Sequence, residues 1–350
     1  MNKFTNPKKR KSSAQPPFIS SGTVSASISI EQTAALIPTI IWAAVKYSSR
    51  VFLLCIISAA VSAAADFAAR LILKFTVKSK KDSAVRFDIY PIFIGLCTVC
   101  MLPYNVSLAA LVIFDLLAVA LKYLLDGIIS PIAAARTLMI PITANFGASF
   151  FYSNSERMTT PLSILSKSEL PDDSLTDMFL GRSDGMIGEI SAVLILLCMV
   201  YLLIRGHIQW ETPAAAVAAA FVVAFEFAPD SVEYYLFAIS EILCGGLLFG
   251  AVFIASDRRR QPVSMYGRLI YGALIGVLAM VIRLNTDIDG IYPAVALLSL
   301  FTPLIDRFTA TSPFGGYRRK PAKSAKKQPT SDGEKPENGE NTEKNAENEN

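Results

Sequence analysis

Apolar residues along this chain form runs long enough to cross a lipid bilayer, with shorter polar segments between them. A helix needs about 20 mainly apolar residues to span the hydrocarbon core, so these runs predict transmembrane helices. About ten spans are expected, at residues 28–47, 51–73, 87–103, 107–125, 127–147, 186–204, 213–229, 234–255, 266–284 and 288–305. The predicted fold class is therefore an all-α polytopic membrane protein.

Composition agrees with this fold class. Hydrophobic residues make up 52% of the chain and charged residues 18%, which is too little charge for the surface of a soluble protein of this length. The five cysteines all fall inside apolar runs, which is typical of small packing residues rather than of a disulfide framework or a metal site. The basic cluster Lys8–Lys11 is interpreted as an anchor at the membrane surface, and no nucleic-acid binding is expected.

The charge of the loops predicts the orientation. Most lysines and arginines lie at the N-terminus, in the loops at 74–86 and 256–265, and after residue 305, whereas the loop at 148–185 is poor in them. Under the positive-inside rule both termini are cytoplasmic and the 148–185 loop is extracytoplasmic. The chain is thus divided into a basic segment (1–27), a transmembrane domain (28–306), and a polar tail (307–350) that is expected to be disordered because it has almost no apolar residue. The expected location is the cytoplasmic membrane of a bacterium.

Several ionisable residues fall inside predicted spans, where charge is costly and needs a partner or a role. Asp115 and Arg136 lie near the middle of consecutive spans and are predicted to form a buried ion pair, as are Asp66 and Arg70, which are four residues apart on one helix. Three further carboxylates are expected near the extracytoplasmic ends of consecutive spans and are candidates for an ion pathway: Glu189, Glu226 and Glu241. Each could equally be an interfacial residue in contact with water or lipid headgroups.

Longer motifs connect the chain to a known family. The segments Gly245–Ala251, Gly267–Gly276 and Thr302–Arg307 occur in an order and spacing that resembles the RnfD family, the D subunits of the Rnf electron transport complex. That family is related to NqrB, the B subunit of the sodium-pumping NADH:quinone reductase. Gly188-Glu189 and Pro17–Gly22 are also similar. The resemblance covers roughly residues 16–307.

The resemblance implies a membrane subunit of a redox-driven pump that couples electron transfer between ferredoxin and NAD to the transport of Na⁺ or H⁺. In that family a threonine in the outside loop carries FMN through a phosphoester, and Thr160-Pro161-Leu162 is similar to the end of its motif. The flavin would supply redox chemistry that no side chain offers, and a second flavin is left open. Sister membrane and peripheral subunits, and the bilayer, are the implied partners.

The motif before Thr160 departs from the family pattern, since Asn154 stands in place of aspartate and Arg157 in place of serine. An ordinary loop threonine before a proline turn therefore remains the alternative to a flavin attachment site. At the level of function the alternatives are a flavin-less scaffold subunit and an unrelated solute transporter. In none of these would the chain be a complete enzyme alone.

Overall fold

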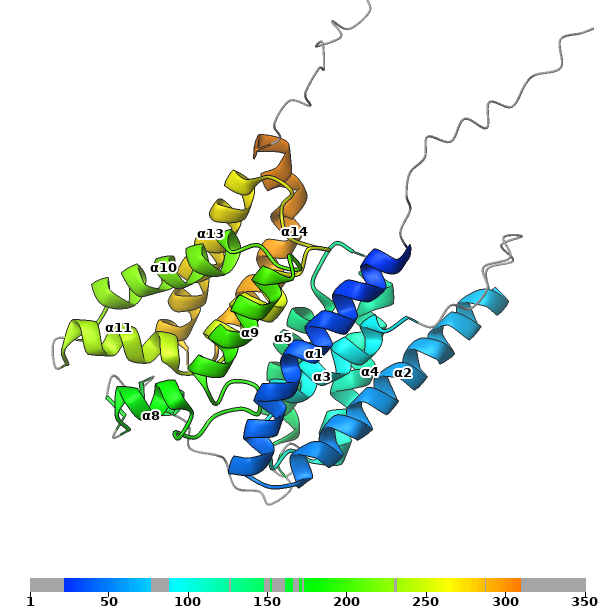
Figure 1. The fold of residues 1–350 in the computed structure, drawn as a ribbon, viewed down its shortest axis with the longest axis horizontal. Helices are drawn as coiled ribbons and strands as arrows, with labels where there is room; N and C mark the ends of the chain where they lie inside the picture. The colour runs from blue at the N-terminus through cyan, green and yellow to red at the C-terminus, as the bar shows by residue number, and fades with distance from the viewer. Residues whose placement is uncertain are drawn as a thin grey trace, which may run out of the picture. The chain divides into compact units, whose positions relative to one another are not determined.

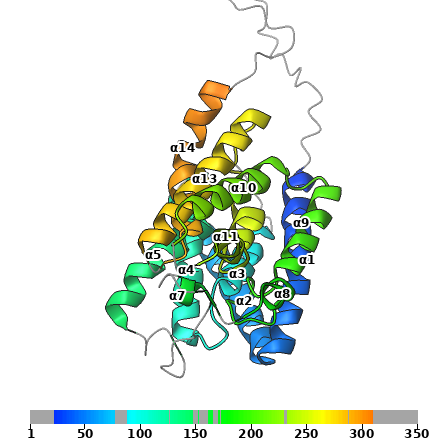
Figure 2. The ribbon, with the colours of Figure 1, turned by 90° about the vertical axis from the view of Figure 1, so that its left-hand side faces the viewer.

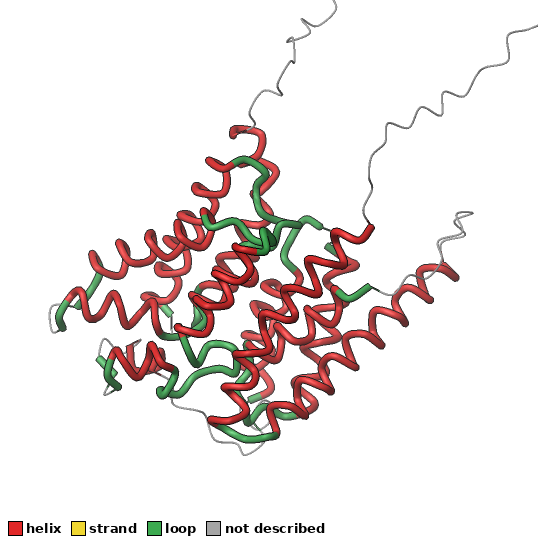
Figure 3. The backbone as a smooth tube through the Cα atoms, viewed as in Figure 1, coloured by secondary structure: helices red, strands yellow, loops and turns green. Residues whose placement is uncertain are grey.

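The protein is described by a computed structural model made almost entirely of packed helices (Figure 1). The described residues are 22–76, 88–125, 127–147, 152, 161–165, 170–171, 173–229, 232–286 and 288–309. Within them there is no strand, and one isolated bridge joins Val106 to Tyr152 (Figure 3). The predicted all-α class is confirmed for this part of the chain. Thr160, the basic N-terminal segment up to residue 21 and the polar tail from residue 310 lie outside the described residues.

The longer helices follow the predicted apolar runs. They are α1 (Gly22–Lys46), α2 (Arg50–Thr76), α3 (Tyr90–Cys100), α4 (Leu108–Leu124), α5 (Pro131–Phe146), α9 (Ala192–Ile204), α10 (Glu211–Glu226), α11 (Tyr234–Leu243), α13 (Met265–Asn285) and α14 (Ile291–Thr309). Shorter elements are α7 (Pro161–Leu165), α8 (Leu175–Leu180), α12 (Leu247–Phe249) and the π-helical turn η1 (Gly250–Ala255). Ser107, Ser174, Ser191 and Ser264 begin α4, α8, α9 and α13 by accepting a backbone N–H from the third residue that follows, as N-cap residues do.

Four of these helices are long and apolar enough to cross a membrane by themselves: α1 over Ser27–Lys46, α2 over Arg50–Lys74, α13 and α14. A fifth candidate span is the pair formed by α11 and the α12–η1 segment, which is bent by 58°. The apolar helices α3 and α9 are shorter, with 11 and 13 residues. The structure therefore supports a multi-pass membrane protein with four or five clear spans among the described residues, and the number ten stays a prediction.

Glycine allows close packing between α10 and α13, which lie side by side in Figures 1 and 2. A Cβ at Gly272 would meet the Ala215 Cβ at 3.1 Å and crowd the Thr212 carbonyl, and a Cβ at Gly276 would meet the Ala219 Cβ at 3.0 Å. Small residues spaced four apart let helix backbones approach in lipid, where the hydrophobic effect does not drive helices together. This contact holds α13, and with it Arg283, in a fixed rotation against α10.

The two ends of the helix bundle differ in chemistry. One end, here called the loop end, carries α7, α8 and residues 181–191, together with the C-terminal end of α1 and the N-terminal end of α9. The opposite end, here called the arginine end, carries Arg258–Arg260 and the N-terminal ends of α3 and α13.

Candidate functional site

The candidate site lies at the loop end, where a predicted span is interrupted. Helix α11 ends at Leu243 and α12 begins at Leu247, so three residues between them are not helical. Gly245 has φ +68°, a left-handed conformation that glycine adopts without strain. The Gly246 N–H donates to Asp289 Oδ2 at 2.6 Å, so a side chain satisfies a backbone group that the broken helix leaves unpaired.

A buried arginine links the break to two carboxylates. Arg283, on the last turn of α13, places Nη1 3.0 Å from Glu241 Oε2 and Nη2 2.6 Å from Asp289 Oδ1. The side chains of Arg283 and Glu241 are each 2% exposed, so both charges are removed from solvent. Because a lone buried charge would be very costly, each of these groups depends on the other two.

Glu189 faces the same break from a different part of the chain. The turn that carries it is fixed by backbone bonds from Ile187 N–H to the Leu102 carbonyl at 3.1 Å and from Gly188 N–H to the Cys100 carbonyl at 2.7 Å. A side chain at position 188 would clash with Cys100 and Phe249, which explains why the residue before Glu189 is glycine. The Glu189 carboxylate is buried and accepts a hydrogen bond from the Tyr292 hydroxyl on α14.

Gly246 is where these groups come closest together. A Cβ there would lie 2.6 Å from Asp289 Oδ2 and 2.5 Å from Glu189 Oε1, and closer still to the Tyr292 hydroxyl. No space for a side chain is left between the two carboxylates and the phenol. We refer to Glu189, Glu241, Arg283, Asp289 and Tyr292, gathered around Gly246, as the break cluster.

A small cavity opens beside the break cluster. Its volume is about 40 Å³, and its lining includes Pro161, Gly185, Glu189 and Asp289. One buried water molecule needs a cavity volume of about 10–15 Å³, so a cavity of about 40 Å³ holds two or three water molecules or one small cation. An isoalloxazine ring system does not fit in it. A flavin on Thr160, which directly precedes Pro161, would therefore have to place its ring elsewhere.

The wall of this cavity at residues 183–185 is held by the end of α1. Lys46 donates to the carbonyls of Arg182, at 2.9 Å, and Ser183, and its ammonium lies 3.4 Å from Asp184. The Tyr47 hydroxyl donates to the Gly185 carbonyl at 2.9 Å, and burial raises the pKa of Tyr47, which keeps it protonated as a donor. The first hairpin of the chain thus positions the loop that follows α8.

The other residues predicted for an ion pathway or ion pairs have different positions. Glu226 is exposed at the end of α10, and no bond among the described residues joins it to Glu189 or Glu241. The predicted Asp115–Arg136 pair is wrong: Asp115 accepts a hydrogen bond from Thr98 on α3, while the Arg136 guanidinium lies 5.9 Å from the Tyr292 ring centroid. The two residues lie on neighbouring helices but point in different directions around the helix axes. The prediction used only their similar depth in the membrane, which does not fix these directions.

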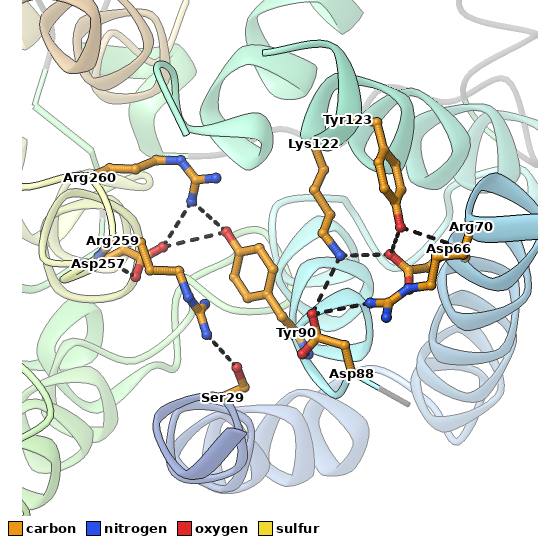
Figure 4. Close-up of polar contacts among 10 residues, drawn as sticks. All are labelled: Ser29, Asp66, Arg70, Asp88, Tyr90, Lys122, Tyr123, Asp257, Arg259 and Arg260. Atoms are coloured by element: carbon orange, nitrogen blue, oxygen red, sulfur yellow. Dashed lines mark hydrogen bonds and ion pairs between the residues drawn. The ribbon is translucent and has the colours of Figure 1, made fainter. Parts of the chain in front are cut away.

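Asp66 does lie against Arg70, with Nε 2.6 Å from Oδ2, and belongs to a larger network at the arginine end (Figure 4). Lys122 and the Tyr123 hydroxyl also contact Asp66, at 2.6 and 2.8 Å, and Asp88 lies 3.3 Å from Arg70. These contacts tie α2 to α4 and to the start of α3.

A second part of the same network contains two arginines of the basic loop at 256–265, whose charge was used above only to predict the orientation. Arg260 is buried, and its Nη1 lies 2.6 Å from the Tyr90 hydroxyl and 3.2 Å from Asp257 Oδ2 (Figure 4). The Arg259 guanidinium stacks 3.8 Å from the Tyr90 ring centroid and donates to Ser29 Oγ at 2.7 Å. These two arginines join α1 and α3 to the segment after η1.

Sequence reasoning missed Arg283, Asp289 and Tyr292 at the loop end. The available signal was an arginine within the last turn of a predicted span, six residues before an aspartate that precedes a glycine. Arg283 and Asp289 were at the boundaries of their predicted spans, where a charge is easily assigned to the interface. Their burial follows from how α13, α14 and the break fit together.

The described structure is that of a multi-pass helical membrane protein with a broken helix and a buried charge cluster near one end. The NQR2, RnfD, RnfE family matches residues 12–315 of the chain. The chain therefore belongs to the NQR2, RnfD, RnfE family.

Individual relatives are similar over shorter stretches. The D subunit of the Na⁺-translocating ferredoxin:NAD⁺ oxidoreductase complex of Acetobacterium woodii is 30% identical over 197 residues, which are 54% of this chain and 60% of that protein. The D subunit of the proton-translocating complex of Clostridium ljungdahlii is 32% identical over 142 residues, 40% of this chain and 43% of the relative. The B subunit of the Na⁺-translocating NADH-quinone reductase of Chlamydia pneumoniae is 34% identical over 149 residues, 39% and 30% of the two chains. The chain thus spans 30–60% of the length of these relatives.

Proposed function

We propose that this chain is a membrane subunit of a redox-driven complex that couples electron transfer between ferredoxin and NAD to the transport of Na⁺ or H⁺. Family membership and the activities for which the relatives are named support the class of reaction. The observation that carries the assignment to this chain's own residues is the Glu189 carboxylate, which is buried beside a helix break and lines a cavity of the size of a small ion. Sister subunits of such a complex are the proposed partners.

The break cluster has the chemistry that an ion pathway requires. Two carboxylates, on Glu241 and Asp289, pair with the guanidinium of Arg283. A third, on Glu189, lines the small cavity, which Arg136 also borders. Broken helices near a binding site expose backbone groups that can contact ions, and intramembrane carboxylates bind hard cations or relay protons. In this proposal Glu189 is the group that an arriving cation or proton meets, while Arg283 keeps the other two carboxylates paired.

A Glu189→Gln substitution tests this role in membrane vesicles that contain the assembled complex. Because glutamine preserves the shape and can accept from Tyr292 but carries no charge, ferredoxin-driven ion uptake is expected to fall at least tenfold. Uptake is measured with radioactive sodium and with a proton-sensing dye. Glu226→Gln, at the exposed end of α10, is the matched control and should retain full uptake. Equal uptake in both variants would remove Glu189 from the pathway.

Covalent FMN on Thr160 is the second part of the proposal. Its support is the Thr160-Pro161-Leu162 sequence and the location of Pro161 and Leu162 beside the break cluster. A bound flavin would supply one- and two-electron transfer, which the chain's own side chains do not offer. The small cavity does not accommodate its ring.

Fluorescence of the denatured chain in a gel tests the attachment. When the protein is produced together with its own flavin transferase, the wild type is expected to give a fluorescent band that Thr160→Val abolishes. Thr159→Val is the matched control because it leaves the Thr160 hydroxyl in place. A dark wild-type band would favour the alternative of a flavin-less scaffold subunit, which Asn154 and Arg157 support because they depart from the attachment motif.

The orientation is also proposed: the loop end is extracytoplasmic and the arginine end cytoplasmic, in line with the charge of the loops. Ser174 is exposed at the loop end and Val263 is 85% exposed at the arginine end, while all five native cysteines are buried. On intact cells an impermeant thiol reagent is therefore expected to label Ser174→Cys and to spare Val263→Cys. The opposite labelling pattern would reverse the orientation.

A further inference from the structure

The ammonium at the end of α1 lies among three oxygen ligands. Lys46 Nζ donates to the Arg182 carbonyl at 2.9 Å and to the Ser183 carbonyl, and it lies 3.4 Å from Asp184 Oδ1. Three consecutive residues thus supply two carbonyls and one carboxylate, which match the three N–H donors of an ammonium. Sets of oxygen atoms of this kind are also the ligands that hard metal cations prefer. The Lys46 ammonium therefore occupies a position where a free metal cation would find the same ligands.

These oxygens lie at the boundary between the small cavity and the outside of the protein. Among the described residues that line this cavity, Asp184 is the one that is exposed, and its side chain is 56% exposed. The buried Glu189 lines the same cavity from inside. A cation held at Asp184 is therefore at the outer mouth of the cavity that Glu189 lines.

The segment that carries these oxygens is held by side chains rather than by secondary structure. From Ser183 to Gly185, no backbone–backbone hydrogen bond forms within the described part of the chain. The Gly185 N–H donates to the Tyr47 hydroxyl at 2.8 Å, and this hydroxyl donates to the Gly185 carbonyl at 2.9 Å. Segments with few bonds open at a low free-energy cost, and a lysine carries its charge on a flexible stem of methylene groups. Withdrawal of Lys46 thus frees the oxygens without breaking a helix.

We propose that the carbonyls of Arg182 and Ser183 and the carboxylate of Asp184 form a binding site for Na⁺, here called the mouth site. The Lys46 ammonium is its built-in competitor. Because the two cations need the same ligands and repel each other, Na⁺ binds as Lys46 withdraws. The binding itself is independent of the proposed function, whereas a place for the mouth site on the ion pathway through Glu189 rests on it.

Sodium binding to the purified full chain tests the mouth site, with the Kd measured from the line broadening of sodium in nuclear magnetic resonance. Lys46→Met removes the competing charge and keeps an unbranched side chain, so Na⁺ should bind at least tenfold more tightly than to the wild type. The gain should be lost when Asp184→Asn is added, because that substitution removes the charged ligand. Arg205→Met is the matched control: it frees the Glu31 carboxylate on the same helix, whose other neighbour is a tyrosine hydroxyl, and should give no gain.

A second measurement keeps Lys46 and asks whether Na⁺ displaces it. Ser183→Cys places a thiol at a position that is 8% exposed and lines the small cavity, while all five native cysteines are buried. Its reaction with a thiol reagent is expected to be about threefold faster in sodium chloride than in choline chloride of equal ionic strength. Asp184→Asn should abolish this difference. The measurement remains informative if Lys46→Met fails to fold.

The outcomes separate the mouth site from the proposed pathway. Wild-type sodium affinity in folded Lys46→Met, an equal gain in Arg205→Met, or equal labelling rates in sodium and choline would each overturn the mouth site. Sodium binding with the expected variant pattern, together with full ion uptake in Glu189→Gln, would retain the mouth site and remove Glu189 from the pathway. Loss of uptake in Glu189→Gln without sodium-dependent labelling would retain the pathway and refute the mouth site.

Discussion

Replacing Arg283 by methionine is expected to lower the free energy of unfolding by about 3–5 kcal/mol. The substitution leaves the carboxylates of Glu241 and Asp289 buried without their cation, and breaking a buried ion pair from one side typically costs this much. Methionine retains most of the side-chain volume, so the effect reports charge rather than a void. The same change should release the Gly246 N–H contact, because Asp289 would no longer be held by Arg283.

Unfolding of the detergent-solubilised protein can be followed with a fluorogenic thiol reagent, since all five cysteines are buried in the folded state. Arg182→Met is the matched control: its contact with Asp177 is on the surface, and exposed ion pairs contribute little. Combining Arg283→Met with Glu241→Gln should recover part of the loss because one unpaired charge is removed. An Arg283→Met protein as stable as the wild type would show that the cluster does not hold the break together.

Replacing Gly246 by alanine is expected to disrupt the break cluster from its centre and to destabilise the protein by about 2–4 kcal/mol. The new methyl group would occupy the space between Glu189 Oε1, Asp289 Oδ2 and the Tyr292 hydroxyl, which are its nearest neighbours. To make room, at least one buried hydrogen bond must lengthen or break, so steric strain and lost polar pairing add together. Ion uptake by the assembled complex should fall with it, because the Glu189 carboxylate would be displaced.

Gly185→Ala is the control for this substitution. It lies at the same end and lines the same small cavity, and a Cβ added there would have no neighbouring atom closer than 3.7 Å, so it should leave thermal unfolding unchanged. The comparison separates the effect of adding a methyl group near the site from the effect of adding it at the point of closest approach. Similar unfolding of the two variants would contradict the crowding at position 246.

The sequence was informative wherever a property depends on local composition. Apolar runs located the helices, since each long helix falls on a predicted run. The i, i+4 spacing of Asp66 and Arg70 correctly identified neighbours, because one helical turn fixes that geometry. Gly188 and Gly245–Gly250 were noted first as parts of a family resemblance. The structure explains why glycine is needed there: Gly188 and Gly246 are in close contacts, and the segment forms a break in a helix.

Contacts between helices could not be predicted from local composition. Asp115 and Arg136 lie on consecutive helices, but one meets Thr98 and the other lies over Tyr292. Arg260 belongs to the basic loop at 256–265 that predicted the orientation, and it is buried against Tyr90, 170 positions earlier in the chain. In each case the sequence identified a charged residue but not its partner, because the partner depends on how each helix is rotated about its axis.

By itself, the sequence determined that this is a helical membrane protein, where its helices lie and which family it resembles, because hydrophobic length and motif order are properties of the chain alone. Only the tertiary structure decided which charges meet. Glu189 joins Tyr292 across 103 positions and Arg283 joins Glu241 across 42, and both contacts depend on glycine-mediated packing and on a break that rotates one half of a helix against the other. Such rotations are set by the fit of many side chains at once, which no pattern along a single segment specifies.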